Sequence, residues 1–232
     1  MWRSFEAGRS GHVATSFVRA LDSGMDFDAV RTPVTYVENH DHSTVTEQCG
    51  GRDRWWRTQP LAIALLTACG APMIHNGQEF GEQYWFPEEG SGRVMPRPLR
   101  WGQSADATGS RLLELYRRLI AIRQAHPSLR THNFYPEPYD MRDTRFDAAG
   151  YGVDEDRDVV IFHRWGPDSN GRLERFIVVL NLSAFDQAVD VPFSVNGDWD
   201  DLLNGGTTRV SDYWLRNLTV GSHWGRIFFR RT

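Results

Sequence analysis

Three consecutive polar residues, Asn39, His40 and Asp41, follow a short apolar segment of this chain. The segment, residues 34–37, reads Val-Thr-Tyr-Val, and a continuous run of β-branched and aromatic residues is typical of a buried strand in a parallel sheet. Parallel sheets build binding and catalytic sites from polar groups at the carboxyl ends of their strands. An amide, an imidazole and a carboxylate in that position can hold a polar substrate and stabilise positive charge on it. The pattern therefore predicts one wall of an active site.

This wall is incomplete for acid–base or nucleophilic catalysis. Asp41 is a single carboxylate, and no second carboxylate in the chain has a comparable setting. Glu79 follows a second short apolar segment, residues 72–76, and could face the same pocket, but we favour a structural role for it. His75 is interpreted as a satisfied core histidine. Three residues of the following loop are interpreted as solvated, although they could line the rim of a cleft: Gln78, Glu82 and Arg93.

Residues 38–42 are also rich in potential metal ligands, because Glu38, His40, Asp41 and His42 lie within five positions. A d-block metal accepts imidazole and carboxylate ligands. Alternate residues at a strand end face opposite ways, however, and the sequence contains no second cluster of His and Asp. We therefore expect no metal site and no cofactor.

The composition of the 232 residues is that of an ordinary globular protein, with 40% hydrophobic and 24% charged residues and a formal net charge of -4. This weak acidity argues against nucleic acid or an anionic membrane as a partner, and no apolar run has the length of a membrane span. Cys49 and Cys69 form no C-x-x-C motif, so neither a disulfide framework nor a zinc ribbon is predicted. The start of the chain lacks the features of a signal peptide. Localisation stays open, with the cytoplasm as the default.

Nine tryptophans are a large number for this length. Sugars expose apolar C–H faces that fit against flat aromatic rings, so this content favours a carbohydrate-binding protein. Packing in the core is nevertheless the more common role of any single indole ring.

The elements that must position the polar segment belong to two regions of the chain. In the first, strands alternate with helices, and in the second, short β-rich runs are separated by glycine-containing turns, which predicts an antiparallel β-sandwich. We expect helices at 12–22, 55–69 and 110–125, short strands at 34–38 and 72–76, and an irregular loop at 80–104. Strands are expected at 159–165, 176–182, 188–193, 198–203, 207–210 and 225–229. Pro60 should kink its helix or mark the effective start of it.

Four segments in this order resemble the α-amylase family, glycoside hydrolase family 13. Residues 34–41 resemble its fourth sequence motif, an apolar run followed by Asn-His-Asp. Residues 70–79 resemble its eighth barrel strand, residues 112–130 its last barrel helix, and residues 179–183 a strand of its C-terminal sandwich. Each motif alone is weak, and their order and spacing make the resemblance specific.

The resemblance implies a fold of α/β followed by all-β. Residues 1–130 would be the last two β/α units of a (β/α)8 barrel of TIM type, and residues 131–232 a C-terminal antiparallel sandwich. It also implies that Asp41 stabilises the transition state and that His40, Asn39 and Glu38 bind substrate. The implied partners are an α-glucan or maltooligosaccharide and the missing N-terminal portion of the barrel.

The motifs that carry this family's nucleophile and its acid/base residue do not occur in the chain. Retaining hydrolysis needs two carboxylates roughly 5 Å apart. We therefore expect a C-terminal fragment of a retaining α-glucan hydrolase, inactive alone. Two parallel strands cannot close a barrel, so the barrel portion is expected to be prone to aggregation.

Three alternatives stay open at this point. Residues 78–81, Gln-Glu-Phe-Gly, are similar to the corresponding segment of branching enzymes, which transfer glucan chains. A non-catalytic carbohydrate-binding protein could retain His40, Asp41 and exposed tryptophans. The chain could also be a subunit that completes the barrel of another polypeptide.

Overall fold

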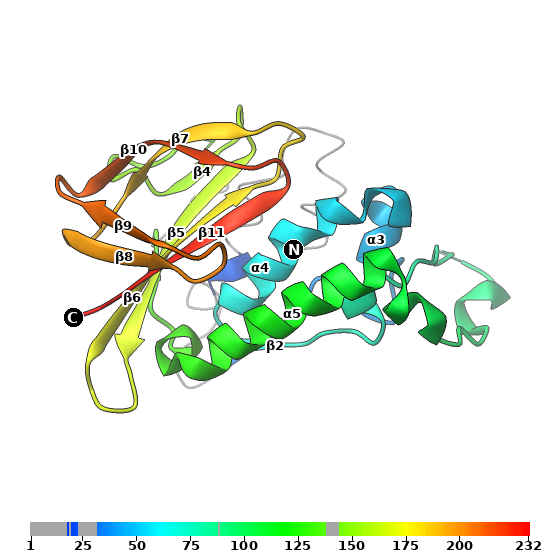
Figure 1. Ribbon diagram of the computed structural model, residues 1–232. Coiled ribbons are helices and arrows are strands. Elements are labelled where there is room, and N and C mark those ends of the chain that lie inside the picture. Colours follow the sequence, from blue (N-terminus) through cyan, green and yellow to red (C-terminus); the bar gives the residue numbers. More distant parts are fainter. Residues whose placement is uncertain (1–17, 19, 23–31, 88, 138–143) are drawn as a thin grey trace.

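The structure, a computed structural model, describes residues 18, 20–22, 32–87, 89–137 and 144–232. The helix expected at residues 12–22 lies mostly outside the described residues. Figure 1 shows a β-rich part that includes the C-terminus and a helical part that packs against it.

The C-terminal half forms two antiparallel sheets, as the alternation of short apolar runs and turns predicts. The larger sheet has seven strands in the order β3-β5-β6-β11-β8-β9, and β4 also pairs with β5; the smaller sheet pairs β7 with β10. All these pairings are antiparallel. The strands are β3 (Phe134–Tyr135), β4 (Gly152–Asp154), β5 (Val159–Pro167), β6 (Leu173–Asn181), β7 (Gln187–Pro192), β8 (Gly197–Asp201), β9 (Thr207–Val210), β10 (Trp214–Val220) and β11 (Trp224–Arg231).

The larger sheet is covered on both faces, which explains why its central strands are apolar at almost every position. Val159 and Ile161 of β5 belong to the core that lies between the two sheets, together with the fully buried Trp199. Val160 and Phe162 point to the opposite face and belong to the core shared with the helices. The sheet therefore serves as the platform on which the helical part is assembled.

The N-terminal half contains two short parallel strands, each followed by a helix. Val34 pairs with Ala71 and Thr35 with Pro72. The elements are β1 (Val34–Thr35), α3 (Val45–Gln48), η2 (Arg52–Thr58), α4 (Gln59–Thr67), β2 (Ala71–Pro72), η3 (Gln78–Phe80), η4 (Ser91–Val94), η5 (Trp101–Ala105), α5 (Ala107–Ala125) and η6 (Pro127–Arg130).

Helix α4 is apolar around its whole circumference because it is covered on all sides. It packs against α5 and against strands β6 and β11 of the larger sheet (Figure 1), and Pro60 through Thr67 are all buried. A helix without a polar face is typical of such a central position. Pro60 stands in its first turn, where its missing N–H is tolerated, which confirms that it marks the start of the helix.

The two strands of this half are shorter than the strands expected at residues 34–38 and 72–76, and the prediction that residues 34–37 form a buried strand was wrong. Only Val34 and Thr35 are in β-conformation, and Val34 is 58% exposed. The physical reason is that, within the described residues, β1 has a single hydrogen-bonded neighbour, β2. With one partner and no second cover, Val34 and Tyr36 remain exposed, whereas Val37 is buried in the core shared with the helices.

Two buried guanidinium groups bind backbone carbonyls, and one of them, Arg164, joins the sheet to the helical part. Arg123 of α5 donates to the carbonyls of Leu66, Ala68 and Gly70, and so closes the C-terminal end of α4 just before β2. Arg164 of β5, which is fully buried, donates to four carbonyls. These belong to Thr67, Leu129, Thr131 and Asn133. The exit of α4 is thereby fixed relative to the sheet.

Candidate functional site

The predicted polar segment forms a tight turn, separated from the end of β1 by Tyr36, Val37 and Glu38. The backbone N–H of Asp41 donates to Oδ1 of Asn39 at 2.9 Å, an Asx turn that fixes the direction of the chain. The side chains of His40 and Asp41 are 83% and 53% exposed, and His40 Nε2 lies 3.5 Å from Asp41 Oδ2. An imidazole and a carboxylate are thus offered together to solvent, where both can form hydrogen bonds with a polar ligand.

Glu38 lies beneath this turn and is almost completely buried. Its Oε2 accepts a hydrogen bond from the backbone N–H of Val45, the first residue of α3, and its Oε1 lies 3.6 Å from Nδ1 of His75. Burial raises the pKa of the Glu38 carboxyl, while His75 and the Val45 amide act in the opposite direction. Glu38 therefore connects the end of β1 to α3 and to the segment after β2, and it holds both ends of the loop that carries His40 and Asp41.

The segment after β2 is more deeply buried than the sequence suggests. Gln78 and Glu82, interpreted above as solvated, are 2% and 3% exposed. Gln78 Nε2 donates to the hydroxyl of Tyr116 on α5 at 2.7 Å, and Oε1 of Glu82 accepts from Nε of Arg100 at 2.6 Å. That interpretation was wrong because the chain turns back onto α5 after Gly77, which has a left-handed φ of 92°.

The remaining residues of this segment have structural contacts. Glu79 Oε2 accepts from the backbone N–H of Gly77 at 3.0 Å, which agrees with the structural role favoured for Glu79. His75 is largely buried beside Glu38, but its Nδ1 has no hydrogen-bond partner among the described residues, so the interpretation of a satisfied core histidine holds for its burial only.

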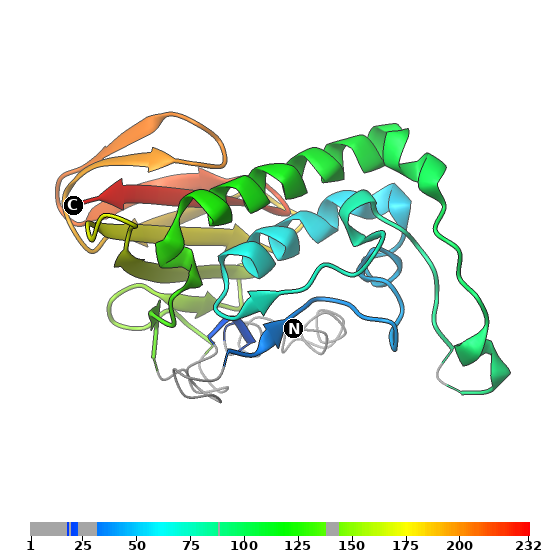
Figure 2. The ribbon, with the colours of Figure 1, turned by 90° about the horizontal axis from the view of Figure 1, so that it is seen from below.

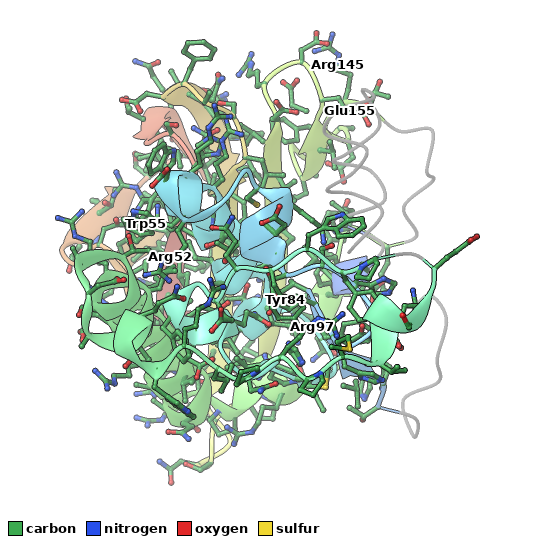
Figure 3. The ribbon with its side chains drawn as sticks, turned by 90° about the vertical axis from the view of Figure 1, so that its right-hand side faces the viewer. Arg52, Trp55, Tyr84, Arg97, Arg145 and Glu155 are labelled. Carbon is green, nitrogen blue, oxygen red and sulfur yellow. The ribbon has the colours of Figure 1, made fainter. Side chains whose placement is uncertain are left out.

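The loop between η3 and α5 extends as a long arm from the helical part (Figure 2). At its base, the guanidinium of Arg97 lies over two aromatic rings, 5.2 Å from the centroid of Tyr84 and 4.4 Å from that of Phe86. Tyr84 and Arg97 are seen close together in Figure 3. Neither residue belongs to the motifs that the sequence brings forward. The available signal was a pair of aromatic residues two positions apart followed by several arginines.

In the part of the chain that the structure describes, no group of three or more His, Cys, Asp or Glu side chains could hold a metal ion. Cys49 is buried, and desolvation raises the pKa of its thiol to about 12, so it is not a thiolate nucleophile at neutral pH. No helix within the described ranges has the length and apolar character needed to cross a membrane.

Comparisons with known proteins give similarities in sequence and in fold. No protein-family model matches the chain. It is 29% identical over 152 residues to "Pullulanase" of Bacillus subtilis (strain 168), a match that covers 59% of this chain and 21% of that protein. It is 30% identical over 117 residues to "Alpha-amylase 2" of Dictyoglomus thermophilum, covering 47% of this chain and 19% of that protein.

Solved structures resemble this one over most of its length. AmyP in complex with maltose matches with a TM-score of 0.67 and 13% identity, covering 93% of this chain and 48% of that one. An alpha-amylase from Geobacillus thermoleovorans, complexed with acarbose, matches with a TM-score of 0.58 and 16% identity, covering 85% of this chain and 38% of that one. In the sequence comparisons, the chain spans about a fifth of the length of the curated relatives it matches. The resemblance inferred from the four motifs is confirmed, and the structural likeness supports the predicted all-β C-terminal domain.

Proposed function

We propose that this chain, which is similar in sequence and fold to the C-terminal region of the α-amylase family, is the C-terminal part of a retaining glycoside hydrolase that acts on α-glucans. In this proposal residues 1–130 supply the last two β/α units of a (β/α)8 barrel and residues 131–232 the C-terminal sandwich. The observation that carries it is the exposed Asn39-His40-Asp41 turn at the carboxyl end of β1, which pairs in parallel with β2.

The roles proposed for these residues follow from their exposure and their hydrogen bonds. Asp41 lies at the surface of the turn, where its carboxylate can stabilise the positive charge that develops on the sugar ring in an oxocarbenium-like transition state. His40 is also exposed and can hydrogen-bond the hydroxyls of the same sugar unit. Asn39, also predicted to bind substrate, fixes the turn by accepting a hydrogen bond from the backbone N–H of Asp41. Glu38 was predicted to bind substrate directly. Because it is buried and bonded to the Val45 amide, we propose that it affects binding by holding the turn in place.

The ligand proposed for this site is a maltooligosaccharide or a longer α-glucan. Solved structures of AmyP contain maltose and maltotriose, and a curated relative is named "Alpha-amylase SusG". These names support the substrate class. They leave the choice between hydrolysis and transfer to another sugar to be tested on this protein.

The nucleophile and the acid/base carboxylate would come from barrel units outside these residues. Two observations support such a completion. Val34 is exposed on β1, and a cavity of about 240 Å³ opens beside β2, lined by Leu66, Pro72, Ile74, Ile120, Arg123, Gln124 and Arg130. Apolar surface of this kind beside a strand is stabilised when further elements cover it.

The first experiment is to read the genomic sequence that precedes the Met1 codon. An in-frame extension that encodes the family's Asp and Glu motifs supports the proposal. A stop codon directly upstream of a ribosome-binding site contradicts it and favours a non-catalytic binding protein or a subunit that completes another barrel.

The second experiment uses the polypeptide encoded by the complete reading frame and measures the release of reducing sugar from soluble starch. We expect Asp41→Asn to lower kcat/KM by at least about 100-fold, because a contact made in the transition state is lost. Asp53→Asn, at an exposed position of η2, is the matched control and should keep wild-type activity. Wild-type activity in Asp41→Asn would overturn the assignment of this residue.

A branching-type transferase is the second candidate, and the reaction products distinguish the two. The residues that suggested it, Gln78 and Glu79, form structural hydrogen bonds with Tyr116 and Gly77, so this segment does not favour transfer over hydrolysis. Reducing ends that increase with time indicate hydrolysis. New α-1,6 branch points at a constant number of reducing ends indicate transfer.

A further inference from the structure

Trp85 is an exposed indole whose two neighbours in the chain are held in place. Its relative exposure is 64%. Tyr84 and Phe86 lie under the same Arg97 guanidinium, so their rings are on one side of the segment. Trp85, which lies between them in the chain, is instead exposed to solvent.

The backbone around Trp85 is bonded to the turn that carries the proposed sugar-binding residues. The N–H of Thr44 donates to the carbonyl of Tyr84 at 3.2 Å, and the N–H of Tyr84 donates to Thr44 Oγ1 at 3.2 Å. The N–H of Phe86 donates to Ser43 Oγ at 2.7 Å. Trp85 is thus attached to residues 43 and 44, two and three positions after Asp41.

Side-chain hydrogen bonds restrain the base of the same segment. Gln83 Nε2 donates to Glu47 Oε2 at 2.8 Å, and its Oε1 accepts from the backbone N–H of Arg52 at 2.8 Å. The buried carboxylate of Glu82 accepts from the backbone N–H of Arg100 at 2.9 Å. A ring presented on a restrained backbone loses little conformational freedom when a ligand binds, which favours affinity.

We propose that Trp85 forms a sugar-binding subsite beside the Asn39-His40-Asp41 turn, where its ring stacks on the apolar C–H face of one glucose unit of an α-glucan. A flat, rigid aromatic ring supplies a large contact area with few rotatable bonds. His40 and Asp41 hold a different unit of the same chain by hydrogen bonds. This inference rests on the substrate class of the proposed function and adds a second point of contact to that site.

The test compares tryptophan variants of the polypeptide encoded by the complete reading frame. Isothermal titration with maltoheptaose should show about ten-fold weaker binding for Trp85→Ala, the loss of one stacking contact. Trp85→Tyr retains a flat ring and should restore most of the affinity. Trp101→Ala is the matched control, because Trp101 is 67% exposed but its ring lies 5.9 Å from that of Phe80 and outside the restrained segment; its affinity should equal that of the wild type.

Unchanged sugar affinity is the result that would overturn the proposal. Unchanged maltoheptaose affinity in Trp85→Ala would show that the ring does not contact the sugar. A lower melting temperature with unchanged affinity would show, in addition, that the ring packs against protein. Failure of the proposed function has a different signature, namely wild-type protein that neither binds nor cleaves glucan, or normal turnover in Asp41→Asn. Weaker binding in Trp85→Ala together with normal turnover in Asp41→Asn would support the subsite and reject the catalytic assignment.

Discussion

Glu38 Oε1 lies 3.6 Å from His75 Nδ1, so that a buried carboxylate and an imidazole connect the segments that follow the two parallel strands. Its other oxygen accepts from the Val45 amide. Glu38→Ala would leave this buried N–H without its acceptor, which costs about 1–3 kcal/mol. We expect a loss of unfolding free energy in that range, measured by urea denaturation. Glu38→Gln keeps an acceptor for the amide and should lose less.

The pH dependence gives an independent check of the same residue. Burial raises the pKa of Glu38 above its usual value of 4.5. Its contribution to stability is therefore fully present below that value and is lost as the pH rises through the pKa of the folded state. We expect stability to decline less steeply with pH over this interval in Glu38→Gln than in the wild type. Identical pH profiles of the two proteins would contradict the burial of the carboxyl group.

Because His163 of β5 is buried, we expect the protein to lose unfolding free energy in acid. His163 is buried beside the rings of Tyr151 and Trp165, and desolvation, followed by the charges of Arg175 and Arg164, lowers the pKa of its imidazole from 6.5 to about 3. A depressed pKa means that its contribution is present above 6.5 and is lost as the pH falls toward 3, with a slope of at most about 1.4 kcal/mol per pH unit.

The corresponding variant is His163→Phe, which keeps an aromatic ring and removes the titrating group. Its unfolding free energy should depend less on pH between 3 and 6.5 than that of the wild type. His40→Gln is the control, because the His40 side chain is 83% exposed. If the unfolding free energy of His163→Phe depended on pH as steeply as that of the wild type, His163 would not be the source of the acid sensitivity.

Much of α5 could be predicted from the sequence because local signals decide it. Leu112 and Tyr116 lie on one apolar face, Asp106 caps the first turn by accepting from the N–H of Gly109, and Pro127 follows the last turn. These signals act within a few residues of one another. The helix begins at Ala107, three positions before the expected start at residue 110.

The candidate site was predictable only in part. The position of Asp41 after a strand follows from its neighbours in sequence. The burial of Gln78 and Glu82 does not, because their partners are Tyr116 and Arg100, 38 and 18 positions away. Likewise, the shortness of β1 depends on what covers its faces and edges. Tertiary partners of this kind override local polarity, and a single sequence does not reveal them.

Gly109 offers a test in which the sign of the effect is opposite to the usual expectation. Replacing glycine by alanine in a helix normally stabilises it by about 0.5–1 kcal/mol. A Cβ at Gly109 would lie 1.9 Å from the carbonyl oxygen of Gln103. We therefore expect Gly109→Ala to destabilise the protein, measured as a lower melting temperature. Gly102→Ala is the control, since a Cβ there meets no atom within 4 Å, and it should leave the melting temperature nearly unchanged.

Arg164 should be the most sensitive of the charged residues described in the sheet. Its guanidinium is fully buried and donates to four backbone carbonyls from α4, η6 and the segment before β3. Arg164→Ala would leave several buried acceptors without donors and open a cavity, which together cost at least about 3 kcal/mol of unfolding free energy. Arg209→Ala breaks only the exposed ion pair with Asp198 and should cost less than about 1 kcal/mol. Equal urea midpoints for the two variants would contradict the conclusion that Arg164 joins the helical part to the sheet.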